Sequence, residues 1–350
     1  MDFNLSEDRR MLSDTLRRYL AEQYDIETRN QAAYHAPFYA PAKYTELADL
    51  GVIGAFVSES AGGFGGEGFD ITTVFEELGR ALCPEPMLAT LLSVRVLADL
   101  EQSTLVDEIV TGQKRPALAV FEPEAGENLI DIQTTFSDGK LTGRKSVVYG
   151  APNADLILVA AKEGDQIGLY LTEAAETVDY AMIDGGGAAE VILDDTPATC
   201  LSNDAQAALE AALDAGRLGL CAEAVGAMDV MLGMTIDYMK QRQQFGRSIA
   251  VFQALQHRVV DMAIEIEQCR SISVLAASHL GVEHSAKYVA MAKNLVGRTV
   301  VKFSEEVIQL HGGIGMTWEY PGAHYAKRLT MIDHQLGDAL TQLHKVMQAA

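Results

Sequence analysis

Basic residues are scarce in this chain of 350 residues. It carries 27 Lys and Arg against 49 Asp and Glu, which gives a formal net charge of −22 at pH 7. Proteins that bind nucleic acid need a basic surface to meet the phosphates, so this balance argues against nucleic acid as a partner. An excess of one charge favours solubility. It also means that any anionic ligand must be met by a local group of basic residues.

Cysteine is scarce as well, and its four positions are scattered without C-x-x-C spacing. This predicts free thiols in a reducing cytoplasm. The eight histidines do not combine with carboxylates at metal-ligand spacing, so no metal site is expected. No uninterrupted apolar run is long enough to span a bilayer, and the polar, acidic start is unlike a secretory signal. We therefore expect a cytoplasmic protein without membrane contact.

The period of the apolar residues changes twice along the chain. From about residue 5 to residue 100 they recur every three to four positions, as in Leu12, Leu16 and Leu20, which predicts helices. Between 116 and 197 they form short runs between turn residues, which predicts strands of a small barrel or sandwich. From 205 onward the helical pattern returns. Segregated helices and strands indicate an α+β fold.

We accordingly expect three domains, with a linker near 197–204. They are an N-terminal helical domain over 1–115, a middle β domain over 116–203 and a C-terminal helical domain over 204–350.

Paired glycines follow a long helical segment in Q-L-H-G-G-I-G-M-T-W-E-Y, which covers 309–320. Gly312 and Gly313 remove side chains where the backbone could approach a ligand closely. Their N–H groups, at a helix boundary, could face an anion such as a pyrophosphate. On this pattern alone, a helix C-cap followed by a turn is an equally good interpretation.

A second segment, R-Q-Q-F-G-R-S-I-A-V-F-Q-A-L-Q-H over 242–257, favours the ligand interpretation. The two segments read R-x-x-F-G-x-x-I-x-x-F-Q-x-x-Q-H and Q-x-x-G-G-x-G-x-T-x-E, in this order. Together they resemble the acyl-CoA dehydrogenase family of flavoproteins. Weaker similarity at 62–66 and 75–79 extends the resemblance over almost the whole chain. The family has a helical, a β and a four-helix domain in this order, so residues 204–350 are expected to form a four-helix bundle.

The resemblance implies FAD as cofactor, clamped by two subunits. The matching positions that hold FAD are Arg242, Phe245, Gln253, Gln309, Gly312 and Gly313. The residue types suit this role, because a guanidinium is a forked donor for phosphate and an aromatic ring offers an apolar face. Asp214 and Arg217 match the opening of the helix that lines the acyl-CoA cleft, which implies substrate binding. An ordinary pair on a helix surface is the alternative for these two.

The family reaction removes two hydrogens from the α and β carbons of an acyl-CoA, and a carboxylate accepts the α proton. The family supplies this base from one of two positions. Here they are Gly337, nine residues past Arg328, and Gly216, just before Arg217. A glycine has no side chain that accepts a proton, so neither usual base is present.

Three explanations stay open. Asp338, beside Gly337, could serve as base after a backbone shift, with Asp333 a poorer candidate. A sister chain of a hetero-oligomer could contribute the base, as in family members of bacterial steroid side-chain degradation. The chain could also be a non-catalytic FAD-binding or structural subunit. The resemblance further implies a homotetramer or an α2β2 assembly, and an electron-transfer flavoprotein as electron acceptor.

The middle domain departs from the family pattern. Phe121 stands where a hydroxyl is usual, Glu127 and Asn128 replace a Ser-Asp pair, and Val147 replaces a tryptophan, with Tyr149 nearby. Side-chain contacts from this domain to flavin are therefore left open, and backbone N–H groups could still serve.

Overall fold

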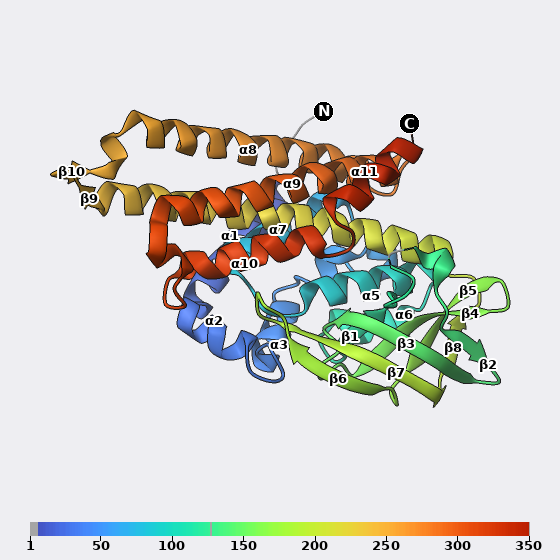
Figure 1. Ribbon diagram of the computed structural model, residues 1–350. Helices are drawn as coiled ribbons and strands as arrows, with labels where there is room; N and C mark the ends of the chain where they lie inside the picture. The colour runs from blue at the N-terminus through green and yellow to red at the C-terminus, as the bar shows by residue number, and fades with distance from the viewer. Residues whose placement is uncertain (1–5, 127, 350) are drawn as a thin grey trace. The chain divides into compact units, whose positions relative to one another are not determined.

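A computed structural model describes residues 6–126 and 128–349 of the chain (Figure 1). The chain forms two compact units. One, the helical unit, comprises the chain up to Ile26, the segment Ile71–Cys83 and the chain from Arg217 onward. The other, the sheet unit, comprises Glu27–Asp70 and Pro84–Gly216. Helices precede the first strand and return after the last one, so the predicted α+β order is confirmed. The three predicted domain boundaries stay a prediction.

Long helices make up most of the helical unit. They are α1 (Glu7–Gln23), α4 (Gly68–Ala81), α7 (Gln206–Gln241), α8 (Gln253–Ala277), α9 (Ser285–His311), α10 (Pro321–His334) and α11 (Ala339–Gln348). The first residues of α4 and α7 belong to the sheet unit. Helix α9 contacts α8, α10 and α11, and Figure 1 shows these helices side by side. Ala, Leu, Met and Gln dominate them, and these residues favour long uninterrupted helices.

Two glycines allow α4 and α7 to approach closely. A Cβ on Gly79 would overlap the backbone of Glu223, and a Cβ on Gly226 would overlap the backbone of Glu76. Any larger residue at either position would push the helices apart. The crossing therefore depends on small side chains.

Helix α7 is the most apolar long helix of the described residues. It contains charged residues, so it is not an uninterrupted apolar run, but by length and mean composition alone it is long and apolar enough to cross a membrane. However, 67% of its apolar window is buried inside the protein. The core helix of a soluble protein passes the same test, so the signal is weak.

The sheet unit joins short helices to an eight-stranded sheet. Its helices are α2 (Ile26–Ala33), α3 (Pro41–Asp49), α5 (Met87–Asp99) and α6 (Ser103–Val110), with short 3-10 turns at Gly54–Phe56, Glu59–Ala61 and Leu129–Asp131. The strands are β1 (Pro116–Ala119), β2 (Thr135–Ser137), β3 (Lys140–Tyr149), β4 (Leu156–Glu163), β5 (Gln166–Thr172), β6 (Glu176–Ala181), β7 (Gly187–Pro197) and β8 (Thr199–Ser202).

These strands pair in the order β6-β7-β3-β2-β4-β5-β8, and β1 pairs with β4 in parallel. Buried Val159, Tyr170 and Val191 are part of the core on the sheet, where the ring of Phe136 stacks on Tyr170 at 4.0 Å.

Two details of the sheet unit differ from the sequence-based expectation. The linker predicted near 197–204 contains β8, which pairs with β5. No individual apolar run was identified over β6 or β7 within the predicted strand region, and β6 pairs along its whole length with residues 187–192 of β7. The reason is visible in β6, whose side chains are mostly exposed and polar, so it lacks the apolar alternation on which the prediction relied.

Candidate flavin and base sites

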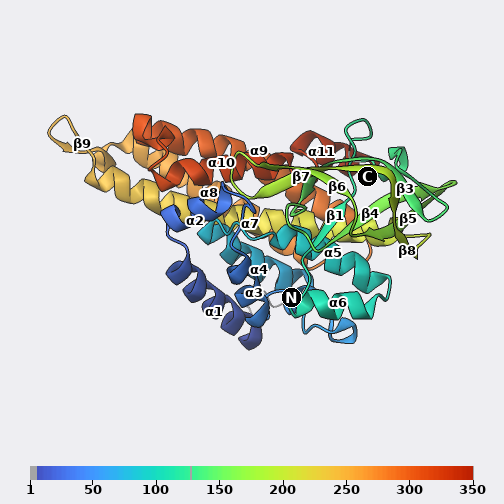
Figure 2. The ribbon, with the colours of Figure 1, turned by 90° about the horizontal axis from the view of Figure 1, so that it is seen from below.

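A tight hairpin projects Phe245 from one end of the helical unit. Strands β9 (Gln243–Gln244) and β10 (Arg247–Ser248) pair in antiparallel fashion, and Figures 1 and 2 both show the hairpin extending beyond the ends of α7 and α8. Phe245 and Gly246 both have positive φ, 55° and 76°, as a two-residue type I′ turn requires. Phe245 is 89% exposed. A large aromatic side chain held in a strained conformation in solvent is typical of a binding surface.

The paired glycines lie where α9 passes into the short 3-10 helix η5 (Gly312–Met316). Gly312 has φ 69° and ψ −147°, a conformation that only glycine adopts readily. Its N–H donates to the Ile308 carbonyl, so this N–H is not available to an anion, contrary to the sequence-based expectation. Gly313 has no positive φ, and a Cβ there would meet no atom within 4 Å. The chain itself therefore does not require glycine at 313, and the open space suits a ligand that approaches the backbone.

A group of three aromatic side chains holds the residue before this turn. The Tyr238 hydroxyl donates to the His311 carbonyl at 3.0 Å, and the two rings stack at 4.6 Å. His311 Nδ1 lies 2.9 Å from the Val307 carbonyl, so Nδ1 carries the proton and Nε2 accepts from the Tyr320 hydroxyl at 2.6 Å. Burial lowers the pKa of His311, which favours this neutral form.

This aromatic group also brings the end of α7 against the end of α9. The hairpin and the glycine turn therefore lie at the same end of the helical unit. The sequence analysis assigned no role to Tyr238, His311 or Tyr320. His311 and Tyr320 lie in the segment 309–320, but nothing in that segment shows that Tyr238 of α7 meets them.

All six residues predicted to hold FAD are exposed to solvent, namely Arg242, Phe245, Gln253, Gln309, Gly312 and Gly313. They come from the hairpin, the first residue of α8 and the end of α9. An exposed guanidinium, an exposed aromatic ring and an open glycine turn fit the chemistry of a cofactor with a pyrophosphate and a flat ring system. The residue types and the open space thus fit FAD.

A second set of residues surrounds the turn between α10 and α11, where the family base is expected. Leu336 and Gly337 have positive φ, 55° and 101°. The fully buried Lys293 of α9 donates to the carbonyls of Ile332 at 2.8 Å, Asp333 at 2.9 Å and Gly337 at 2.9 Å. The ammonium therefore donates hydrogen bonds to carbonyls at the end of α10 and also fixes the turn that follows.

Arg217 of α7 contacts the same turn between α10 and α11. Its guanidinium is buried, and its Nε donates to the Leu336 carbonyl at 2.8 Å. This contact positions the turn. The role of Arg217 in substrate binding stays a prediction, as does that of Asp214, which is half-buried in the part of α7 that belongs to the sheet unit.

Both carboxylates proposed as replacement bases accept hydrogen bonds from N–H groups at the start of α11. Asp338 is the N-cap of α11, and its Oδ1 accepts from the Thr341 N–H at 2.7 Å. Asp333 Oδ1 accepts from the Ala339 N–H at 3.0 Å. The hydrogen bonds from Thr341 hold the pKa of Asp338 below its usual range, which makes this carboxylate a weaker proton acceptor. Its role as base stays a prediction, but the geometry favours a capping role.

Comparison with known proteins identifies the family. Residues 6–100 match the family description "Acyl-CoA dehydrogenase, N-terminal domain", and residues 205–343 match "Acyl-CoA dehydrogenase, C-terminal domain". "Acyl-CoA dehydrogenase IpdE2" of Mycobacterium tuberculosis is 30% identical over 328 residues, which cover 92% of this chain and 91% of the relative. The chain belongs to the acyl-CoA dehydrogenase family.

Two further relatives agree. "Acyl-CoA dehydrogenase IpdE2" of Mycolicibacterium smegmatis is 28% identical over 345 residues, 98% of each chain. Among solved structures, a variant of the "Tcur3481-Tcur3483 steroid ACAD" superposes with a TM-score of 0.89 at 28% identity, covering 98% of this chain and 97% of that one.

In this acyl-CoA dehydrogenase, the middle-domain segment that departs from the family pattern is anchored by a buried ion pair. Glu122 accepts from the Thr134 N–H at 3.0 Å and from the Lys145 ammonium at 2.7 Å. Burial lowers the pKa of Lys145 to about 8. The Phe121 carbonyl accepts from the Ser146 N–H at 2.9 Å, so the two segments are fixed together.

Val147 follows Lys145 by two residues in β3, where the pairing of β3 with β7 is irregular. It has φ 51° and is partly exposed. Glu127 lies outside the described residues. Flavin contacts from this domain stay a prediction.

Proposed function

We propose that this chain is a FAD-binding subunit of an acyl-CoA dehydrogenase that introduces the α,β double bond into a CoA thioester, with the proton-accepting carboxylate supplied by a sister chain. The turn between α10 and α11 carries this proposal. Gly337 offers no side chain, and the Asp338 carboxylate is engaged as the cap of α11. Gly216, at the other family position, is buried inside α7. The chain thus has glycine at both positions that the resemblance assigns to the base, and the neighbouring Asp338 caps a helix.

FAD is the cofactor, and when bound it accepts a hydride from the β carbon. Arg242 is suited to hold its pyrophosphate and Phe245 to cover an apolar part. At Gly313 the absence of a side chain lets the cofactor approach the backbone closely. Because the hairpin carries Phe245 far into solvent, we propose that these residues reach the FAD shared with a neighbouring subunit.

The relatives support a partner of the same fold. One solved relative is a paired steroid enzyme by its name, so we propose an α2β2 assembly and a bulky, steroid-derived acyl group as substrate. A cytoplasmic location without membrane contact, and an electron-transfer flavoprotein as electron acceptor, complete the proposal.

Anaerobic bleaching of the flavin tests the assignment of the base. The chain is purified alone and together with its sister chain, and each preparation is mixed with acyl-CoA esters of increasing bulk. We expect bound flavin that bleaches only in the two-chain complex, and Asp338→Asn should leave that bleaching intact. Bleaching by the chain alone that Asp338→Asn abolishes would refute the sister-chain base in favour of Asp338. A two-chain complex that never bleaches would indicate a subunit without dehydrogenase activity.

The flavin content of Arg242→Ala tests the cofactor site. We expect this variant to lose bound FAD, because the exposed guanidinium is the phosphate donor of the hairpin. Lys240→Ala is the matched control, since it removes an exposed cation from the end of α7. Full flavin content in Arg242→Ala would show that the cofactor is held elsewhere.

A further inference from the structure

The segment that carries the paired glycines is closed on itself by the side chains at its two ends. His311 precedes the segment and Tyr320 follows it, and the Tyr320 hydroxyl donates to His311 Nε2 at 2.6 Å. The centroids of the two rings lie 4.9 Å apart. Between these ends, every residue from 312 to 319 except Gly315 is exposed. We call residues 311–320 the closed loop, because one hydrogen bond joins its first and last side chains.

Both partners of this hydrogen bond are held in place by their own surroundings. His311 Nδ1 donates to the Val307 carbonyl at 2.9 Å, and the Tyr238 ring stacks on the imidazole at 4.6 Å. Tyr320 is the N-cap residue of α10, and its ring lies so close to Gly322 that a Cβ there would come within 2.6 Å of it. The hydrogen bond therefore ties the end of α9 to the start of α10.

The middle of the closed loop has room for a ligand. A Cβ on Gly312 or Gly313 would meet no atom within 4 Å. The Trp318 carbonyl accepts from His324 Nε2 at 2.8 Å, which anchors the loop a second time near its end. An exposed segment loses conformational entropy when it is ordered, and a contact that joins its ends removes part of that freedom beforehand. A ligand that binds at the glycines then meets a loop that is already ordered.

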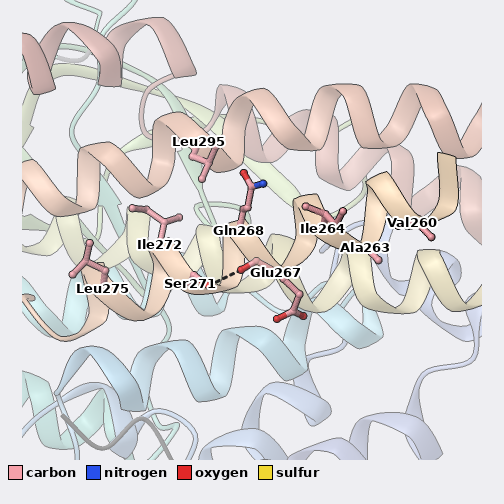
Figure 3. A pocket seen from close by; sticks show the side chains of 9 residues that line it. All are labelled: Val260, Ala263, Ile264, Glu267, Gln268, Ser271, Ile272, Leu275 and Leu295. Carbon is pink, nitrogen blue, oxygen red and sulfur yellow. Dashed lines mark hydrogen bonds between the residues drawn. The ribbon is translucent and has the colours of Figure 1, made fainter. Parts of the chain in front are cut away.

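A second place for a ligand on the helical unit is the open groove of ≈ 750 Å³ along α8, which Figure 3 shows. Of the nine described side chains that line it, only Glu267 is ionisable, and it is an acid. A pyrophosphate needs cations or N–H donors, and a carboxylate repels it. At the closed loop, by contrast, the Lys327 ammonium lies 4.6 Å from the centroid of the Trp318 ring. The charges therefore favour the closed loop over the groove as the place for FAD.

We propose that the hydrogen bond from Tyr320 to His311 is a positioning contact for the cofactor. It holds the closed loop in its binding conformation before FAD arrives, so the cofactor does not have to order the loop itself. Tyr320 and His311 act through the loop and not by touching FAD. This inference rests on the proposed function, since it assumes that the glycine turn holds the cofactor.

Tyr320→Phe tests the positioning contact, because it removes one hydroxyl and keeps the ring. We expect the dissociation constant for FAD, measured by titration of the flavin-free protein, to rise about 2- to 10-fold, which corresponds to one hydrogen bond. Tyr325→Phe is the matched control, because its hydroxyl donates to the Arg80 carbonyl and not to the closed loop. It should destabilise the fold to a similar degree and bind FAD like the wild type. A wild-type dissociation constant in Tyr320→Phe would overturn the proposal.

The fluorescence of Trp318 tests the same contact without cofactor. Trp318 is the single tryptophan of the chain, and it lies inside the closed loop with 51% of its surface exposed. In the flavin-free chain, we expect Tyr320→Phe to raise the rate constant of acrylamide quenching and to lower the anisotropy, while Tyr325→Phe changes neither. Weaker FAD binding with an unchanged Trp318 signal would mean that Tyr320 contacts the cofactor directly, which would refute the positioning role.

The two readouts also separate this inference from the proposed function. If the Trp318 signal changes in Tyr320→Phe while Arg242→Ala and Gly313→Ala keep the wild-type FAD affinity, the cofactor lies elsewhere. That result would overturn the cofactor site and with it the link between the closed loop and FAD. If Arg242→Ala and Gly313→Ala lose FAD and Tyr320→Phe does not, the cofactor site stands and the positioning role alone fails.

Two substitutions of His311 separate its donor from its acceptor. The amide oxygen of His311→Gln reaches the place of Nε2 and can accept from Tyr320, whereas the amide nitrogen of His311→Asn takes the place of Nδ1 and leaves Tyr320 without its acceptor. We expect His311→Gln to bind FAD more tightly than His311→Asn. In the His311→Asn background, Tyr320→Phe should cause no further loss, because residues that act through one contact are not additive. Equal FAD affinity of the two His311 variants, or additive losses, would overturn the proposal.

Discussion

Replacing Gly313 by alanine distinguishes a glycine that the fold requires from a glycine that ligand binding requires. Gly313 lies in η5 without a positive φ, and an added Cβ would have no neighbour within 4 Å. The folded chain can therefore take the methyl group without strain. Gly→Ala at a compatible position stabilises by about 0.4–1 kcal/mol, since the unfolded chain loses freedom. We expect the free energy of unfolding to stay unchanged or to rise by this amount.

The affinity for FAD should fall in the same variant. If the cofactor approaches the backbone at Gly313, a methyl group displaces it and weakens the hydrogen bonds to its charged groups. A hydrogen bond to a charged group contributes about 1.5–3 kcal/mol. At 1.4 kcal/mol for each factor of ten, the dissociation constant should rise about 10- to 100-fold. Gly312→Ala cannot make this distinction, because its φ of 69° strains the fold as well.

Two measurements on the same preparations decide the matter. Titration of the apoprotein with FAD gives the dissociation constant, and urea denaturation without flavin gives the stability. Gly233→Ala is the control, because a Cβ there also meets nothing within 4 Å, on the exposed side of α7. It should leave both the FAD affinity and the fold intact. If Gly313→Ala binds FAD like the wild type, the open space at the glycine turn is not a ligand site and the assignment of this turn is wrong.

Three further predictions follow from the contacts of the helical unit. Lys293→Met should lower the free energy of unfolding by about 3 kcal/mol or more in urea denaturation, since three carbonyls lose their donor. Asp338→Ala should lower it by about 1 kcal/mol near neutral pH. Because the folded-state pKa of Asp338 is lowered, this contribution is present above the unfolded pKa of about 4. It should vanish as the pH falls through the folded value, so denaturation at several pH values should show the two proteins converging in acid. Tyr320→Phe removes the donor to His311 Nε2, so the pKa of His311 should rise in an NMR titration, and an unchanged value would refute the assigned tautomer.

The sequence predicted the elements whose signals are local. The glycine pair at 312–313 and the apolar periodicity of the long helices act within a few residues, so the glycine turn and the α+β order could be expected. The hairpin of β9 and β10 was not predicted, and Gly246 was noted only as part of a motif. The family resemblance rested on the same short segments. Strands β6 and β8 lacked such a signal, because their side chains are largely exposed and their pairing partners supply the reason for being strands.

The sequence by itself determined the residue types at the candidate sites. Above all, it places glycine at 216 and 337, the two positions where the resemblance implies a carboxylate. Only the tertiary structure decided what surrounds them. Lys293 and Arg217 lie 44 and 120 positions from Gly337 in the chain, yet both donate hydrogen bonds to carbonyls of the turn that contains Gly337. Asp338 accepts a hydrogen bond as the cap of α11. These contacts join helices far apart in sequence. The energy of a buried charge depends on which carbonyls surround it, and a local sequence pattern does not show which carbonyls these are.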